Sequence, residues 1–168
     1  ITLQQEIRKK GEGAYSPLGQ KPVKHTNVQT VFPVQEICLW EPENPHLYEI
    51  RTSLWKNGEM IDARVDITGF REAGFRKDGF YLNGKKLRLR GLNRHQSYPY
   101  VGYAAPASMQ IFDADILKKE LGVNAVRTSH YPQSQDFIRR CDEIGLLVFT
   151  EFPGWQHIGN GSGRRCRI

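Results

Sequence analysis

The sequence predicts a chain of mixed class, in which a β-sandwich segment is followed by the alternating strands and helices of a parallel sheet. Residues 48–68 alternate apolar and polar side chains with period two on either side of Asn57-Gly58, which is typical of a β-hairpin. From residue 109 onwards, apolar side chains recur at helical spacing between short strands, which is the rhythm of βαβ units. The chain is therefore expected to contain two kinds of β structure.

The first 70 residues are expected to be β structure. Residues 28–37 are rich in β-branched side chains, and the hairpin strands cover 48–55 and 60–68, with one face buried as in a β-sandwich. Residues 11–20 are rich in Gly, Ser and Pro and are predicted to form a loop. Before the hairpin, residues 40–48 contain two prolines, which fix φ and make a rigid corner.

Turn and cap residues define the elements of the second part. A second hairpin is predicted at 79–90 around the turn pair Asn83-Gly84. Residues 146–149 form a continuous apolar run, which is typical of a strand buried on both faces. The remaining predicted elements are helices at 109–121 and 134–144, the latter capped by Ser134 and Gly145, and a strand at 125–127.

A doubly wound sheet and a (β/α)8 TIM barrel both fit this order of elements. No glycine-rich phosphate loop follows any of these strands, which removes the usual signature of a dinucleotide-binding sheet. Polar side chains instead gather just after the strand ends, at 93–95, 127–131 and 151–157. Because a TIM barrel builds its active site at the carboxyl ends of its strands, this placement favours the barrel.

Composition and charge narrow the function classes. The net charge is +6, but Arg164, Arg165 and Arg167 supply three of those charges and no aromatic side chains interleave with a basic stripe, which disfavours a nucleic-acid partner. No apolar run approaches the roughly 20 residues of a membrane span, so no membrane partner is expected. The three cysteines have neither zinc spacing nor a disulfide framework, which favours a reducing compartment such as the cytoplasm.

Two of the polar clusters contain residue types that bind sugars. His95, next to Asn93 and Arg94, can hydrogen-bond sugar hydroxyls, although the residues alone favour the simpler interpretation of a hairpin end with solvated basic side chains. Arg127 is suited to orienting a carboxylate by bidentate contact, and His130 can donate a hydrogen bond to a hydroxyl.

The third cluster follows the last apolar strand. Glu151 comes directly after that strand and is expected near the site, either as a functional carboxylate or as a structural one paired with an arginine. Trp155 can stack on the apolar face of a sugar or pack under a loop, and the residues favour neither interpretation. Glu151 and His157 lack a third ligand, so no metal site is predicted.

Three segments together form a long and specific pattern: Trp-Glu-Pro-Glu-Asn-Pro-His-Leu-Tyr at 40–48, Arg-Gly-Leu-Asn-Arg-His at 90–95 and Asn-Ala-Val-Arg-Thr-Ser-His-Tyr-Pro at 124–132. The pattern resembles glycoside hydrolase family 2, the β-galactosidase type of retaining enzyme. The resemblance implies part of an immunoglobulin-like β-sandwich at 1–72, followed by the N-terminal part of a (β/α)8 TIM barrel at 73–159. Residues 160–168 match nothing in the family and are expected to be a flexible tail.

The resemblance also implies roles for the residues of the polar clusters. By resemblance, His95 and His130 bind galactoside hydroxyls and Arg127 steadies the nucleophilic Glu of the family. Trp155 is the fourth substrate-binding candidate, from its residue type and its ability to stack on a sugar. Supporting roles in the floor of the site fall to Asn93, Arg94 and Glu151. The family's acid/base Glu and its nucleophile have no match in this chain, so no catalytic residue is assigned.

The resemblance implies a carbohydrate ligand, a β-galactoside, and no cofactor within this chain. Some family members bind Mg²⁺ through a Glu two residues before a His in the third loop. Here Trp155 occupies that place before His157, so a divalent cation is expected only in the intact parent enzyme. Because three strands cannot close an eight-stranded barrel, self-association through the open sheet edge is a further expectation.

The predicted function is therefore that of part of a retaining β-galactosidase, which acts on terminal β-galactosides and is inactive alone because both reacting carboxylates are missing. Glucuronidase and mannosidase specificities stay open. Two alternatives also stay open: a non-catalytic carbohydrate-binding or interaction module, and a complementation partner that becomes active when a second chain supplies the missing strands.

Overall fold

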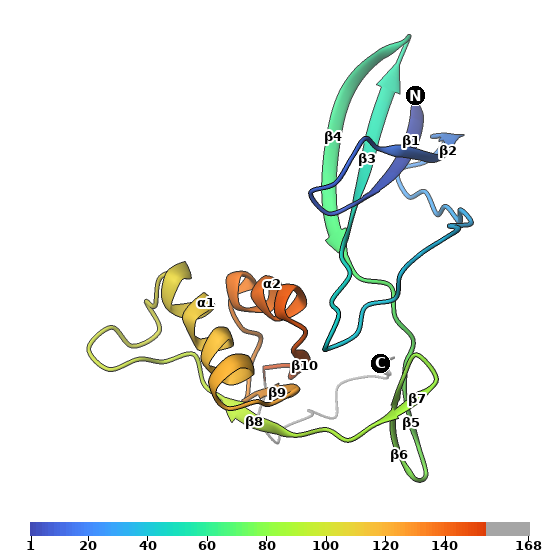
Figure 1. The fold of residues 1–168 in the computed structure, drawn as a ribbon. Helices are drawn as coiled ribbons and strands as arrows, with labels where there is room; N and C mark the ends of the chain where they lie inside the picture. Colours follow the sequence, from blue (N-terminus) through green and yellow to red (C-terminus); the bar gives the residue numbers. More distant parts are fainter. Residues whose placement is uncertain (154–168) are drawn as a thin grey trace, which may run out of the picture.

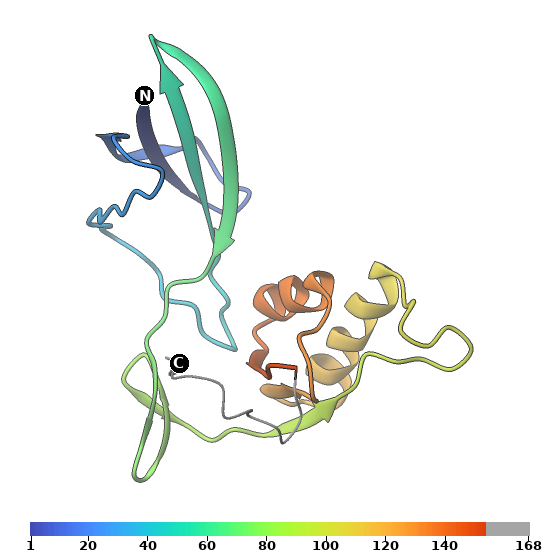
Figure 2. The same ribbon diagram turned by 180° about the vertical axis from the view of Figure 1, so that it is seen from behind.

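The computed structural model describes residues 1–153, which form an antiparallel sheet and a smaller unit of parallel strands and helices, joined by an extended chain (Figure 1). Seen from behind, in Figure 2, the two helices lie together on one side of the parallel strands. None of the helices in residues 1–153 has the length and the apolar stretch that crossing a membrane requires.

The first sheet has four antiparallel strands in the order β2-β1-β3-β4. They are β1 (Thr2–Lys9), β2 (Ser16–Pro22), β3 (Tyr48–Lys56) and β4 (Glu59–Thr68). The predicted hairpin is confirmed, since β3 and β4 meet at Asn57 and Gly58 with φ values of 52° and 85°. Both central residues thus have the positive φ that a tight hairpin turn needs.

Two predictions for the first part of the chain are wrong. The predicted loop at 11–20 overlaps β2, because pairing with β1 overrides the local Gly and Pro content, and prolines are tolerated on an edge strand. Residues 28–37 form no strand, and one of their contacts with the sheet is a side-chain hydrogen bond, in which the Thr30 hydroxyl donates to Gln5 Oε1 of β1 at 3.2 Å.

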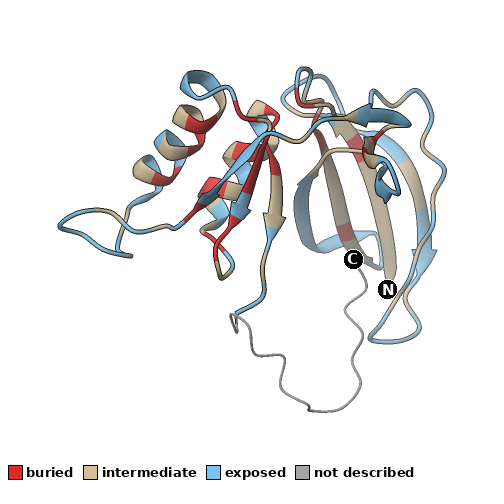
Figure 3. Ribbon diagram, turned by 90° about the horizontal axis from the view of Figure 1, so that it is seen from below, coloured by how far each residue is buried: buried red, intermediate tan, exposed pale blue. Residues whose placement is uncertain are grey.

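The hairpin was also expected to bury one face, and the structure contradicts this. The apolar side chains of β4, namely Met60, Ile61, Val65 and Ile67, are each about half exposed, and no second sheet packs over them within residues 1–153. Figure 3 shows this sheet mainly in the colours of exposed and intermediate residues, whereas the buried residues concentrate around the helices and parallel strands. The described sandwich part is thus a single layer.

A three-stranded meander, β5 (Ala73–Arg76), β6 (Gly79–Leu82) and β7 (Lys85–Leu87), follows. The turn Asn83-Gly84 is confirmed, but the strand after it is shorter than predicted and ends at Leu87. The side chain of Asn124 explains the early end. Its Oδ1 accepts from the Arg90 backbone N–H at 2.8 Å and its Nδ2 donates to the Arg88 carbonyl at 3.0 Å, so a side chain replaces the hairpin partner there.

The parallel sheet has the order β10-β9-β8, with β8 (Gly91–Arg94), β9 (Ala125–Thr128) and β10 (Leu147–Thr150). Helix α1 (Ala107–Asp115), its π-helical continuation η1 (Ile116–Glu120) and helix α2 (Gln135–Ile144) connect them. Strand order follows chain order and both helices cover the same face, as at the start of a (β/α)8 barrel and unlike a doubly wound sheet (Figure 1).

The predicted caps of α2 are confirmed. The Ser134 hydroxyl accepts a hydrogen bond from the Asp136 N–H at 3.2 Å, and Gly145 ends the helix in the left-handed conformation at φ 77°. The apolar face of α2 then packs with α1 and the outer face of the sheet in one core, formed by Ala114, Leu117, Val123, Val126, Phe137, Cys141 and Leu146.

Trp40 joins the sandwich part to the barrel part. Its side chain is 1% exposed and lies in a second core with Leu47, Phe80, Leu82, Ala125 and Leu147. Its indole Nε1 donates to the Asp142 carbonyl at 2.8 Å, near the end of α2. The proline corner expected at 40–48 therefore holds the two parts of the molecule together.

Candidate functional site

Side chains from three successive parallel strands meet on the face of the sheet opposite the helices. The strand register aligns Asn93 of β8, Arg127 of β9 and Phe149 of β10. Since side chains alternate between the faces of a strand, Glu151, two residues after Phe149, continues on the same side as Arg127. These residues line a cavity of about 460 Å³ whose floor is apolar and includes Ala125 and Phe149.

Glu151 is held by three residues at the end of this row. Arg127 Nε donates to its Oε1, and His130 Nδ1 lies 3.0 Å from its Oε2. Its backbone N–H donates to Thr128 Oγ1 at 3.1 Å. Both carboxylate oxygens therefore have partners, and the arginine and the imidazole are fixed relative to each other through Glu151.

The electrostatics of this cluster follow from these contacts. Removal from water raises the pKa of Glu151, but the hydrogen bonds from Arg127 and His130 outweigh that effect and hold its pKa below the ordinary value of 4.5. Glu151 is thus a carboxylate at neutral pH, and it keeps Arg127 and His130 in place.

Replacing Arg127 by glutamine is expected to raise the pKa of Glu151, because the largest of the interactions that favour the charged form is lost. A depressed pKa in the folded state stabilises the fold above the ordinary pKa, and this contribution disappears as the pH falls below 4.5 through the depressed value. Titration of the Glu151 carboxyl carbon by NMR in both proteins measures the pKa directly. An unchanged pKa in the variant would show that Arg127 is not its partner.

The two histidines predicted for the site are neighbours. The His95 and His130 rings lie 5.6 Å apart in an edge-to-face arrangement, and the Tyr131 ring follows His95 at 6.1 Å. His95 is exposed and His130 is half-buried. The structure therefore brings together five of the predicted residues: Asn93, His95, Arg127, His130 and Glu151.

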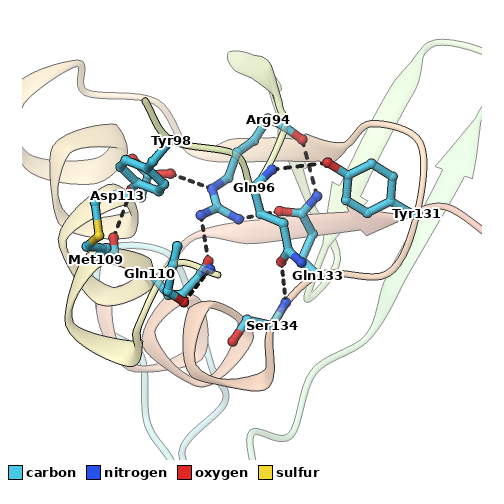
Figure 4. A network of polar contacts seen from close by, with 10 residues as sticks. Arg94, Gln96, Tyr98, Met109, Gln110, Asp113, Tyr131, Gln133 and Ser134 are labelled. Atoms are coloured by element: carbon cyan, nitrogen blue, oxygen red, sulfur yellow. Dashed lines mark hydrogen bonds and ion pairs between the residues drawn. The ribbon is translucent and has the colours of Figure 1, made fainter. Parts of the chain in front are cut away.

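Arg94, the sixth, lies on the other side of the sheet. Its side chain is 5% exposed and points between the helices and the loop before α2, as Figure 4 shows. Its guanidinium donates to Asp113 Oδ2 at 2.7 Å, to Gln110 Oε1 at 2.7 Å and to Gln133 Oε1, and it lies 3.9 Å from the centre of the Phe137 ring. Because these donors are occupied, Arg94 connects β8 to both helices and does not face the cavity.

The remaining predicted residue, Trp155, lies outside the described residues, as does His157. Within residues 1–153, no three His, Cys, Asp or Glu side chains come together as a donor set for a metal ion. The positions at which the family resemblance would place a divalent cation, Trp155 and His157, lie outside this part of the chain. Sequence reasoning missed Thr128, whose hydroxyl orients Glu151, because only the strand register shows that contact.

Comparison with known proteins explains this arrangement. Residues 1–71 match the model of "Glycosyl hydrolases family 2", and residues 74–163 match "Glycosyl hydrolases family 2, TIM barrel domain". The chain belongs to glycoside hydrolase family 2. The β-sandwich segment and the first barrel strands predicted from the sequence are those of this family.

Relatives in glycoside hydrolase family 2 cover most of this chain, but the chain covers little of them. A β-galactosidase of Thermoanaerobacterium thermosulfurigenes is 56% identical over 145 residues, which is 86% of this chain and 20% of that protein. A β-galactosidase of Thermoanaerobacter pseudethanolicus is 59% identical over 122 residues, 72% of this chain and 16% of that protein.

A solved structure agrees with the fold. A crystal structure of a Bacteroides uniformis β-glucuronidase matches 90% of this chain and 19% of its own, with a TM-score of 0.77 and 34% identity. The chain thus spans about a fifth of the length of the relatives it matches.

Proposed function

We propose that this chain supplies part of the sugar-binding floor of a retaining β-galactosidase. The observation that carries the proposal is the inward-facing row of Asn93, Arg127 and Glu151 with His95 and His130 beside it, on the face of the sheet that becomes the inside of a barrel. Amide, imidazole and carboxylate groups at the carboxyl ends of strands are suited to hydrogen-bonding the hydroxyls of a sugar ring. The two relatives named β-galactosidase support the same assignment.

In this proposal the residues of the row bind the sugar and orient it. The groups that break the glycosidic bond lie elsewhere in the intact enzyme. Retaining hydrolysis needs two carboxyl groups about 5–5.5 Å apart, one as nucleophile and one as acid/base. Glu151 is the one carboxylate that lines the cavity in the described part of the chain, and both of its oxygens have partners. Its role is to position Arg127 and His130.

We expect this chain to prefer a galactoside to a glucuronide. A glucuronide carries a carboxylate that needs a cation, and Arg127 is the one cation lining the cavity within residues 1–153. Arg127 is already paired with Glu151. Titration of the chain with methyl β-galactoside and methyl β-glucuronide tests this preference, and tighter binding of the glucuronide would overturn it.

Hydrolysis of a chromogenic β-galactoside by the purified chain and by its Glu151→Gln variant tests whether Glu151 positions its neighbours or takes part in bond breaking. Neither protein is expected to show turnover above the uncatalysed rate. Turnover that Glu151→Gln abolishes would assign the chemistry to Glu151 and contradict the proposal.

The same assay extends to complementation. The three-stranded parallel sheet has two outer strands, β8 and β10, with no further partner within residues 1–153, so strands of a second chain can add to either edge. Mixing with a chain that carries the remainder of a family 2 barrel is expected to produce turnover that neither chain shows alone. No turnover from the mixture, with both chains folded, would count against complementation.

A further inference from the structure

The loop between β8 and α1 carries three tyrosines beside the candidate site. They are Tyr98, Tyr100 and Tyr103, and none of them belongs to the row of Asn93, Arg127 and Glu151. Tyr103 is 66% exposed, yet its ring has a defined position, because it packs edge-to-face against the Tyr131 ring with the ring centres 5.9 Å apart. An exposed aromatic ring held by a second ring is a ready surface for a ligand, since it can be covered with little loss of side-chain freedom.

Hydrogen bonds hold this loop in shape. Tyr98 and Gly102 exchange backbone hydrogen bonds of 3.0 and 2.9 Å across a tight turn. The Tyr98 hydroxyl donates to the Met109 carbonyl in the first turns of α1 at 2.9 Å, as Figure 4 shows. The loop is therefore anchored to the helix that follows it, which holds the backbone next to Tyr103 in place.

Gln96 anchors the other side of the loop. Its Oε1 accepts from the Ser134 N–H at 2.7 Å, and its backbone N–H donates to the Tyr131 hydroxyl at 3.3 Å (Figure 4). The Tyr131 ring is thus fixed at both its hydroxyl and its edge, and the loop is attached to the start of α2 as well as to α1.

A chain of ring contacts connects Glu151 with Tyr103. His130, in contact with Glu151, lies edge-to-face with His95, His95 with Tyr131, and Tyr131 with Tyr103. The next unit of a glycoside whose sugar occupies the row of Asn93, Arg127 and Glu151 needs a surface beside that row, and Tyr131 and Tyr103 are joined to the row through His95 and His130. The two tyrosines at the end of this chain of contacts, Tyr103 and Tyr131, are called the tyrosine shelf below.

We propose that the tyrosine shelf is a subsite for the leaving-group side of a β-glycoside and takes a neutral ring, either an aryl group or a second hexose. The proposal rests on the proposed function, because the position of the subsite is defined relative to the sugar-binding row. Aromatic side chains stack on flat apolar faces, which both a phenyl ring and the C–H face of a hexose provide. The shelf rings are uncharged and carry hydroxyls, which suits a neutral ligand.

The test is calorimetric titration of the full 168-residue chain with methyl β-galactoside, phenyl β-galactoside and lactose. Phenyl β-galactoside, lactose or both are expected to bind about three- to tenfold more tightly than the methyl glycoside, the range expected of one aromatic stacking contact. Tyr103→Ala removes that gain and leaves the methyl glycoside affinity unchanged, while Tyr103→Phe retains most of it. Tyr100→Ala is the matched control, because Tyr100 is fully exposed at the tip of the turn.

The outcomes separate the two proposals. If the methyl glycoside does not bind, the sugar-binding row is wrong and the subsite falls with it. If the methyl glycoside binds but neither larger ligand gains affinity, or if Tyr103→Ala leaves the gain intact, the subsite alone is overturned. A gain with lactose only identifies a hexose as the occupant, and a gain with the phenyl glycoside only identifies an aryl group.

Discussion

Replacing Gly145 by alanine is expected to lower the free energy of unfolding by about 2–5 kcal/mol. Gly145 ends α2 at φ 77°, a conformation that costs a residue with a Cβ roughly 1–2 kcal/mol. A Cβ there would also overlap the carbonyl oxygen of Pro42, and overpacking of this kind costs about 1–3 kcal/mol. Urea unfolding followed by circular dichroism measures the loss.

The overlap matters because the end of α2 is where the two parts of the molecule join. Lys118 Nζ donates to the Pro42 carbonyl at 2.9 Å and to the Gly145 carbonyl at 3.1 Å. Any shift of Pro42 away from a new methyl group weakens the hydrogen bond that its carbonyl accepts from Lys118. It also moves the neighbouring Trp40, which is buried beside the same helix end.

Gly122→Ala is the matched control for this prediction. Gly122 follows η1 with φ 63°, and no atom lies within 4 Å of the position of an added Cβ. Its cost is therefore the conformational one alone, roughly 1–2 kcal/mol. Equal losses in the two variants would show that the overlap of the added Cβ with Pro42 costs nothing.

Replacing Arg94 by alanine is expected to cost about 3–5 kcal/mol, the usual loss when one partner of a buried ion pair is removed. The substitution leaves Asp113 without its ion-pair partner and the carbonyl oxygens of Gln110 and Gln133 without their donor. It also removes the cation over the Phe137 ring, in the centre of the helix core. The same unfolding experiment measures the effect.

Two further variants make the result interpretable. Arg94→Lys keeps the charge, but one ammonium group cannot reproduce the planar fork that reaches three acceptors, so most of the loss should remain. Arg90→Ala removes an exposed arginine of the same segment and should change stability by less than about 0.5 kcal/mol. A loss below 1 kcal/mol in Arg94→Ala would contradict the structural role given to this network.

The sequence predicted best those elements whose signals are local. Asn57-Gly58 and Asn83-Gly84 define their turns, and Ser134 and Gly145 define both ends of α2, because each residue's own chemistry determines the backbone there. The row of site residues was also predictable, since strand ends are recognisable in the sequence and parallel strands place their carboxyl ends side by side.

The wrong predictions concern features that depend on contacts with residues far away in the sequence. Strand β2 exists because β1 lies beside it, which its Gly and Pro content does not reveal. Neighbouring residues of a strand point to opposite faces, so Asn93 faces the cavity while Arg94 is buried against the helices. The expected burial of β4 failed because it depends on a covering layer that residues 1–153 do not provide.

The proposed function requires that one face of the parallel sheet binds a galactoside through His95 and His130. NMR titration of the histidine ring signals with methyl β-galactoside tests it most directly, because His25 and His46 of the sandwich part serve as references within the same molecule. We expect the His95 and His130 signals to shift together and saturably while those of His25 and His46 stay fixed. Fixed signals for His95 and His130 at saturating galactoside would contradict the proposed function.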